Sequence, residues 1–556
     1  MTPGAPTPGT APARPVAETK TRRRSHLLLA IAVWLIYAMT SDGTLSVDPL
    51  SRWDVSEAVA RTGSIALPVE GQHTLERGGA SYSVFLPGQS IEFLPFALVA
   101  VVAERALGVD AETASFGGRF LACTIYVPMV CALAVLGHLA VVRRLGVPPR
   151  AALVSGALVA FATPLWVWGT RGSEEPTIAA LTMWAFAALL DARAVAGRDG
   201  GPGDGRRFVD HLGRCGVLLA FGLVHRSPFA AVCLGALVIA VPLMIRRRDL
   251  LRAALGRFTA WTVVTVAILG IVPVYNALRF GNPLDMGYAA YFEPMGGLWE
   301  TPLLEGVYGL LLSPGKGALL FAPWLILLPA ALCSPAVWRR LGLVAWSILL
   351  IVALHLVVYG AHTFWHGAFG WGVRFNVSLM PLLLVPITLW LTVVQPARIA
   401  RTGLACLAAA SILVQVAGGS MNWGLEMRRH PEGYGIEDGV PPSERAHRDR
   451  WKDVIPVGAA WTWEGSQLRQ RFVNMADKLR GRPLLDGVAD DDPAQIITAW
   501  NAFPIRAGWG LDARVIVTVL WIFWSVLGLA SVGVVIGLVQ AWRQLPADGE
   551  PEHVTA

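Results

Sequence analysis

Two aspartates follow the first long apolar stretch of the chain and are candidates for chemistry at a membrane surface. Asp42 and Asp48 lie in the segment SDGTLSVDPLSRW, after the apolar run that begins at Leu27. A carboxylate at this depth can accept a proton from an acceptor hydroxyl in a site that excludes bulk water. An aspartate at a helix end also serves as a solvated cap, and on position alone the cap is the more common role.

Two later segments place basic side chains next to glycine-rich turns. Lys316 closes the turn SPGKG where an apolar run begins, and backbone N–H groups with an ammonium form a natural phosphate seat. Arg374, in FWHGAFGWGVRFN, can hold a phosphate by a fork of donors, which a lysine cannot do. The same segment contains His366 and Trp371, and a tryptophan ring can stack on a sugar. Interfacial lysines that extend to lipid headgroups and interfacial tryptophan belts are the ordinary alternatives.

Other chemical signatures are weak or missing in the sequence. Glu174 and Glu175 precede Pro176, where we expect them to cap the next helix. His362 and His366 are four residues apart without an intervening glutamate, and no phosphate-loop or dinucleotide motif occurs. The sequence therefore predicts no metal site and no cofactor, and it leaves the participation of a divalent cation open.

The composition is that of a membrane protein. Of 556 residues, 54% are hydrophobic and only 15% are charged, whereas soluble domains carry about 25% charged residues. All six cysteines fall inside apolar runs, which does not suggest a disulfide framework. The net charge of +7 is explained by arginines in cytoplasmic loops and does not require nucleic acid as a partner.

Apolar stretches recur along the chain, and roughly 20 such residues form one transmembrane helix. Every basic cluster falls on the cytoplasmic side when the N-terminus is placed inside. The sequence therefore predicts an all-α polytopic protein of the bacterial plasma membrane, with both termini cytoplasmic and about 11–13 transmembrane helices. The predicted spans are 26–44, 118–142, 151–169, 175–194, 213–225 with 227–246, 257–279, 316–335, 341–360, 376–395, 402–420 and 513–542.

The transmembrane domain is predicted to extend over residues 26–420, including a first outer loop at 42–117. Within that loop the apolar stretch 91–107 would invert every later loop if it spanned the membrane. We therefore expect an in-plane helix at the outer leaflet. Residues 1–25, rich in Pro, Thr and Ala and then basic, predict a disordered cytoplasmic tail.

The C-terminal part divides into three segments. The polar stretch 421–511 contains WTWEGSQLRQRF and DDDPAQ and predicts a small extracytoplasmic cap. The last transmembrane helix follows at 512–542, and a cytoplasmic tail occupies 543–556.

As a set, several motifs make the chain similar to the GT-C superfamily of membrane glycosyltransferases. The likeness is greatest to the bacterial family-39-like members, which are related to protein mannosyltransferases and to the lipid A aminoarabinose transferase. It covers about residues 26–420 and rests on TPLWVWGTRGSEEP, FGNPLDMGY, GLLLSPGKG and WHGAFGWGVRF. The matching single residues in the first outer loop and before the next span are Asp48, Arg52, Trp53, Gly63, Tyr82, Ser83, Pro87, Gly88 and Arg119.

The resemblance implies a GT-C-like bundle that moves a sugar from a polyprenyl-phosphate donor to an envelope acceptor hydroxyl on the outer face. Membrane lipids surround the protein, and the acceptor is a glycan, a lipid or a protein. The resemblance gives the role of general base to Asp48, with Asp42 as the second choice. The residues implied to bind the donor phosphate are Lys316, Arg374 and Arg119, and those implied to contact substrate are Tyr82, His366 and Trp371.

Two alternatives remain at this point. Asp48 is followed by Pro49 where many relatives carry a second acid, and Phe85 and Leu86 stand where some have a charged residue. These departures are compatible with a non-catalytic GT-C relative that acts as a scaffold. A transporter or lipid-handling protein is the other alternative, although such proteins place ionisable residues and broken helices near mid-bilayer, often in paired halves.

Overall fold

The computed structural model of the protein describes residues 16–41, 43, 45–67, 73–198, 201, 203–367, 370–395, 397–420, 460–482 and 513–545. The predicted site residue Asp42 and most of the predicted cap lie outside the described residues. So do residues 1–15 of the N-terminal tail and 546–556 of the C-terminal one.

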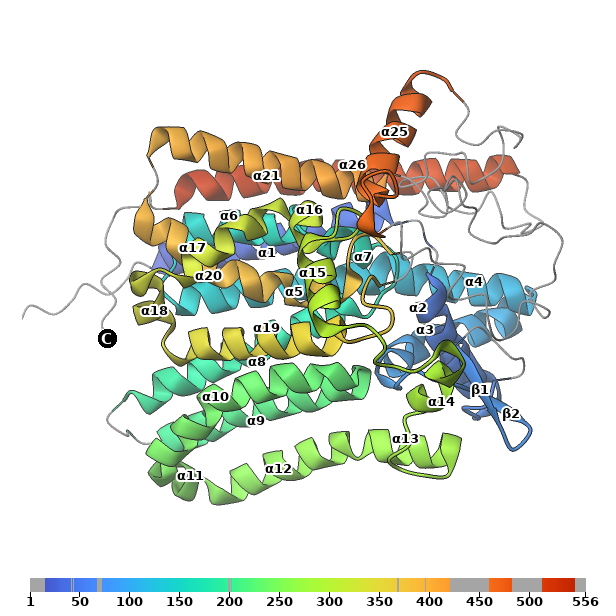
Figure 1. Ribbon diagram of the computed structural model, residues 1–556, viewed down its shortest axis with the longest axis horizontal. Helices are drawn as coiled ribbons and strands as arrows, with labels where there is room; N and C mark the ends of the chain where they lie inside the picture. Colours follow the sequence, from blue (N-terminus) through green and yellow to red (C-terminus); the bar gives the residue numbers. More distant parts are fainter. Residues whose placement is uncertain are drawn as a thin grey trace, which may run out of the picture.

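The described chain is helical apart from one short hairpin, and its longer helices lie side by side (Figure 1). The first half contains α1 (Val16–Thr40), α2 (Val47–Thr62), β1 (Thr74–Arg77), β2 (Ala80–Ser83), α3 (Gly88–Leu107), α4 (Ala111–Leu121), α5 (Val127–Arg144), α6 (Pro149–Phe161), α7 (Leu165–Gly169), α8 (Glu175–Ala196), α9 (Asp204–His225), α10 (Ala230–Arg246), α11 (Arg248–Ala253), α12 (Leu255–Leu269) and α13 (Ile271–Phe280). The second half contains α14 (Tyr288–Phe292), α15 (Leu303–Leu312), α16 (Ala318–Phe321), α17 (Leu328–Leu332), α18 (Pro335–Leu341), α19 (Leu343–Gly360), α20 (Met380–Val394), α21 (Arg398–Gly419), α25 (Gln467–Leu479) and α26 (Ala513–Gln544).

Nine helical segments in the described residues are long and apolar enough to cross a membrane, which confirms the predicted all-α polytopic fold. They are 111–144, 175–196, 204–225, 227–246, 255–280, 343–360, 374–394, 398–419 and 525–544. The predicted hairpin at 213–246 has two segments of ordinary length, because α9 begins already at Asp204. The predicted span 316–335 is instead divided into short helices, with Pro323 and Pro329 at the starts of the second and third pieces.

The N-terminal boundary differs from the prediction. Helix α1 begins at Val16, so the prediction of disorder is wrong for residues 16–25. These residues include Ala17, Glu18 and Lys20, which have good helix propensity and continue directly into the apolar run.

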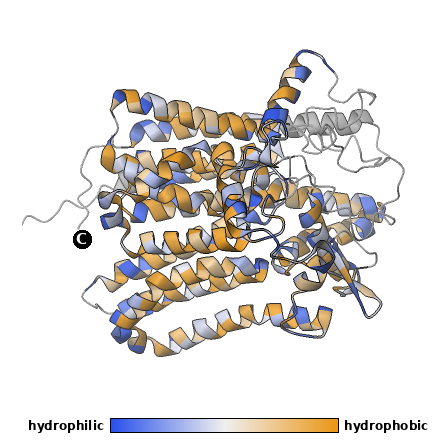
Figure 2. Cartoon of the chain, viewed as in Figure 1, coloured by the Kyte–Doolittle hydropathy of each residue, from blue (hydrophilic) through white to orange (hydrophobic). Residues whose placement is uncertain are grey.

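The ends of the bundle are more hydrophilic than its middle (Figure 2). Helices α2, α3, α4, α14 and the β1–β2 hairpin gather at one end, and α11 and α18 lie at the other (Figure 1). The α11 end contains Arg246, Arg247 and Arg248, and α18 adds Arg339 and Arg340.

Local sequence explains the elements at the α2 end. Asp48 stands in the first turn of α2, where a carboxylate interacts favourably with the helix dipole, and Gly63 ends the helix in the left-handed conformation with φ 73°. The tight hairpin turn needs two residues with positive φ, which Gly78 and Gly79 supply.

The only part of the predicted cap that the structure describes is residues 460–482, and it docks on the bundle through α25. Arg471 is fully buried and donates to the carbonyl oxygens of Ala417 and Gly418 at 2.9 and 3.0 Å, at the C-terminal end of α21. A guanidinium at this place satisfies carbonyls that the helix leaves without partners.

We predict that Gly306→Ala in α15 destabilises the bundle. A Cβ there would lie 1.8 Å from the backbone oxygen of Gly360 in α19, so the two helices would have to separate. Overpacking of this kind costs about 1–3 kcal/mol. In α12, Gly256 meets nothing within 4 Å, and Gly256→Ala is the matched control. The free energy of unfolding in mixed micelles measures both, and equal stability of the two variants would contradict the helix contact.

Candidate functional site

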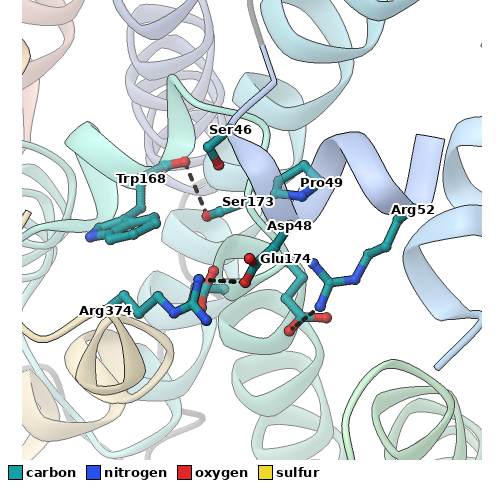
Figure 3. Close-up of a pocket in the computed structure, with 9 residues that line it drawn as sticks. Ser46, Asp48, Pro49, Arg52, Trp168, Ser173, Glu174 and Arg374 are labelled. Atoms are coloured by element: carbon teal, nitrogen blue, oxygen red, sulfur yellow. Dashed lines mark hydrogen bonds and ion pairs between the residues drawn. The ribbon is translucent and has the colours of Figure 1, made fainter. Parts of the chain in front are cut away.

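The candidate site is built around the carboxylate of Asp48. Oδ2 of Asp48 forms an ion pair with Nη1 of Arg374 at 2.5 Å, and Oδ1 lies 3.3 Å from Nε2 of His73 (Figure 3 shows the first contact). Arg374 follows the loop between α19 and α20, and His73 precedes β1. Two of the sequence-predicted residues, 326 positions apart, are therefore in direct contact.

A second cluster of charges lies behind Asp48 and is almost completely buried. Nη2 of Arg52 is 3.0 Å from Oε1 of Glu174, and Nε of Arg226 is 3.1 Å from the same oxygen. Arg226 also reaches Glu175, at 3.4 Å. Two arginines thus balance two glutamates, as buried charges require.

Aromatic rings cover the arginines of this cluster. The guanidinium of Arg52 lies over the ring of Phe85, 4.0 Å from its centroid. That of Arg226 lies 5.4 Å from Phe375 and 5.8 Å from Tyr359. The rings exclude water while attracting the cations, so the charges sit in a medium where their interactions are strong.

The surroundings keep the site carboxyls ionised. Burial alone would raise the pKa of Asp48, but the charge of Arg374, a hydrogen bond from His73 and the more distant Arg52 together hold the pKa well below its usual range. For Glu174, burial is likewise outweighed by Arg52 and Arg226, and its pKa is lowered. Asp48 is therefore a carboxylate at neutral pH, although its pairing with Arg374 makes it a weak base.

A small pocket opens between the two clusters. Its lining consists of Ser46, Asp48, Pro49, Arg52, Trp168, Ser173, Glu174, Glu175 and Arg374 (Figure 3). Its volume is about 190 Å³, open solvent at the mouth included. The space inside the pocket itself is about 10 Å³, enough for about one water molecule, so a sugar phosphate needs more room than the pocket has in this structure.

Lys316 and His366 lie close to Arg374 but do not line the pocket. Nζ of Lys316 donates to the carbonyl oxygen of Gly370 at 2.5 Å, within the same loop that carries His366 and Arg374. His366 is buried. Burial and the charges of Lys316, His362 and Arg374 lower its pKa to about 3, which makes it a neutral ring. The Lys316 turn therefore contacts the loop that contains His366 and leads to Arg374, and Asp48 contacts Arg374.

The described part of the cap contacts this loop region and the Lys316 turn. The carbonyl oxygen of Ala460 accepts a hydrogen bond from the backbone N–H of Gly315 at 3.0 Å and another from the hydroxyl of Ser313. The ring of Trp461 lies 5.0 Å from that of Trp365. Residues 460–461 thus bridge the two segments that carry the predicted phosphate-binding residues.

Three other predicted residues lie elsewhere. Arg119 is close to Asp54. Burial raises the pKa of Asp54 to about 6, and the charge of Arg119 acts in the opposite direction. Tyr82 lies on β2 and packs edge-on against Phe280 at 6.4 Å. The ring of Trp371 packs against Phe321 at 4.9 Å and lies under the guanidinium of Arg471.

The sequence interpretation did not identify the buried partners of the site. Glu174 was expected to cap α8, yet its side chain forms no cap hydrogen bond and pairs with arginines instead. The sequence did contain a signal for this pairing. Glu174 and Glu175 precede Pro176 in one predicted outer turn, Arg226 lies in another, and charges in so apolar a protein need partners. His73 and Tyr291 carry no comparable signal.

Within the residues that the structure describes, no group of three or more His, Cys, Asp or Glu side chains is arranged to hold a metal ion. The acids at the site, Asp48, Glu174 and Glu175, are each paired with an arginine.

No protein-family model and no curated protein sequence matches the chain. Among solved structures it is similar to the oligosaccharyltransferase of Archaeoglobus fulgidus. The complex of that enzyme with Zn and sulfate is 15% identical, with 70% of this chain and 51% of that chain covered at a TM-score of 0.40. The complex with an inhibitory peptide and a dolichol-phosphate is 13% identical, with 76% and 58% covered at 0.40. The apo form is 13% identical, with 76% and 59% covered at 0.43.

The chain spans between 51% and 59% of the length of those structures. Because the TM-scores are low, the site's own geometry remains the basis for a functional conclusion.

We predict that Arg52→Met strongly destabilises the protein, because it removes one of the two arginines that pair with the buried Glu174. Breaking a buried pair costs about 3–5 kcal/mol. Arg77 forms an ion pair with Asp285 that is about half exposed, and Arg77→Met should cost at most about 1 kcal/mol. Unfolding in mixed micelles compares the two variants, and a similar loss in both would show that the Arg52 pair is not special.

Proposed function

We propose that this chain is a membrane glycosyltransferase of the GT-C type, which moves a sugar from a polyprenyl-phosphate donor to an envelope acceptor hydroxyl. The observation that carries the proposal is the contact between Asp48 and Arg374 in a pocket at one end of a transmembrane bundle. A carboxylate base and a guanidinium for a phosphate are the two groups that such a transfer needs. The motif resemblance over residues 26–420 supports the same reaction.

The pocket is proposed to face the outside of the plasma membrane. The arginine-rich turn at 246–248 and α18 lie at the opposite end of the bundle from α2 (Figure 1). An excess of arginine marks the cytoplasmic side, so the Asp48 end is the extracytoplasmic one. A donor sugar on a polyprenyl chain reaches this end from the lipid, and the acceptor reaches it from the water.

Arg374 and Asp48 are proposed to exchange partners when the donor binds. A phosphate that takes Arg374 away from Asp48 removes the interaction that most lowers the pKa of that carboxyl, so its pKa rises. The base therefore becomes stronger only when the leaving group is in place. Separation of the pair also enlarges the pocket, which is too small for a sugar phosphate in this structure.

The chemical step follows from this arrangement. The acceptor oxygen forms a bond to the anomeric carbon and gives its proton to Asp48. The bond between that carbon and the phosphate oxygen breaks, and the phosphate leaves as an anion. Arg374, with Lys316 in the neighbouring turn, stabilises the charge that develops on it. The buried Arg52–Glu174–Arg226 cluster holds the outer ends of the helices in position.

We predict that Asp48→Asn lowers kcat by about 10²- to 10⁴-fold, the usual contribution of a general base. The assay uses purified protein in liposomes with a panel of radiolabelled polyprenyl-phosphate sugars and envelope extract as acceptor. Asp54→Asn is the matched control, because Asp54 lies on the same helix and does not line the pocket. Full activity of Asp48→Asn would move the base elsewhere, with Asp42 next to be tested. An inactive wild type, folded but without transfer of any donor, would contradict the glycosyltransferase.

We predict that Arg374→Gln raises the KM for the donor by about 10- to 100-fold, because charge-assisted hydrogen bonds contribute about 1.5–3 kcal/mol. Arg374→Lys should recover little, since an ammonium cannot form the two-point contact. Arg374 lowers the pKa of Asp48 in the free enzyme, so its removal should shift the acid limb of kcat/KM to higher pH. An unchanged donor KM and acid limb would exclude Arg374 from phosphate binding.

A further inference from the structure

His73 joins the site to the hairpin and to α14. Its Nε2 lies 3.3 Å from Oδ1 of Asp48, and its Nδ1 lies 2.8 Å from the hydroxyl of Tyr291. The three residues come from α2, from the position before β1 and from α14. The backbone of His73 is fixed as well, because its carbonyl oxygen accepts a hydrogen bond from the N–H of Val84 at 3.0 Å.

The chemistry of the three groups determines the direction of the hydrogen bonds. An ionised carboxylate only accepts, so the ring nitrogen that faces Asp48 carries the proton. In a neutral imidazole the other nitrogen is then an acceptor, and the Tyr291 hydroxyl donates to it. This tautomer is assigned from the hydrogen-bond network. The chain therefore runs from Tyr291 through His73 to Oδ1 of Asp48.

Asp48 is held on two sides in this structure, by Arg374 at Oδ2 and by His73 at Oδ1. In the proposed reaction Arg374 binds the donor phosphate, and its ion pair with Asp48 is lost. Arg52 cannot replace it without leaving Glu174. The hydrogen bond from His73 remains, and it orients the carboxylate after Arg374 has moved to the phosphate.

We propose that His73 is a positioning residue for the base Asp48 and that Tyr291 acts through it by fixing its tautomer. The inference rests on the proposed function. His73 keeps Oδ2 directed at the acceptor hydroxyl once Arg374 has bound the phosphate. A carboxylate free to turn would lose the alignment on which the rate of the chemical step depends.

The same contacts could serve only to attach the hairpin to α2, and the kinetics separate the two roles. We expect His73→Phe to lower kcat by about 10- to 100-fold with the donor KM nearly unchanged, because misalignment at this distance costs about that much. His73→Gln keeps an N–H that can donate to Asp48 and should recover most of the rate. Loss of donor affinity in place of kcat, or no recovery with glutamine, would overturn the proposal.

Tyr291 provides an independent test, because glutamine has no tautomer to fix. Tyr291→Phe should lower kcat several-fold in the wild-type background and leave it unchanged in the His73→Gln background. Additive losses in the two backgrounds would mean that Tyr291 acts by packing alone, and they would overturn its assigned role.

Thermal unfolding of the same variants distinguishes a failure of this inference from a failure of the proposed function. Melting temperatures of His73→Phe, Tyr291→Phe and the double variant should be non-additive if the hydrogen bond between the two residues exists. Additive shifts overturn the chain of contacts even when the enzyme transfers sugar. Coupled melting with unchanged kcat overturns the positioning role while the glycosyltransferase stands. The melting temperatures can also be non-additive while the wild type transfers no sugar. That outcome overturns the proposed function and shows that the contacts of His73 have only a structural role.

Discussion

Charges that are withdrawn from water must be paired, and this constraint governs the α2 end of the bundle. Three acids and three arginines meet there: Asp48, Glu174, Glu175, Arg52, Arg226 and Arg374. An isolated charge at such a depth costs several kcal/mol, so each side chain has to reach its partner. Because the partners belong to α2, α8, the α9–α10 turn and the segment before α20, the pairing fixes how these elements meet.

The balance of charges also bears on how a substrate enters. Six charges that are paired with one another leave little attraction for a neutral ligand, and the pocket leaves little space for any ligand. An anion is different, since it can replace one carboxylate as the partner of an arginine. Arg374 is the suitable member, because its side chain is 22% exposed, whereas that of Arg52 is 4% exposed and Arg226 contacts two buried glutamates. If the proposed function holds, this arrangement selects a phosphate over uncharged sugars before any contact with the sugar itself.

Much of the architecture and part of the site could be predicted from the sequence. Apolar length and arginine distribution are local properties, and they predicted eight of the nine candidate spans in the described residues near their observed positions. The predicted spans 26–44, 151–169 and 316–335 are not among those nine. The exception was the first segment of the predicted hairpin, 213–225, which was predicted too short. The first turns of α9 are polar, so the apolar pattern does not indicate that the helix begins at Asp204. The motif resemblance named Asp48 and Arg374 as candidate site residues, but their contact was not predicted. His73, Tyr291 and Glu174 could not be chosen, since their partners are set by tertiary packing between segments up to 218 residues apart.

The ion pair between residues 48 and 374 has a consequence for biogenesis. Chains are made from the N-terminus, so Asp48 and Arg52 are synthesised long before Arg226 and Arg374. Arg52 lacks its partner until Glu174 is made, and Asp48 lacks its arginine until residue 374 is made, so burial of either charge before then costs free energy. The contact between α2 and the segment before α20 therefore cannot form until most of the chain has been synthesised. A chain that stops before residue 374 has its helices only as far as α19, and it lacks the arginine that pairs with Asp48.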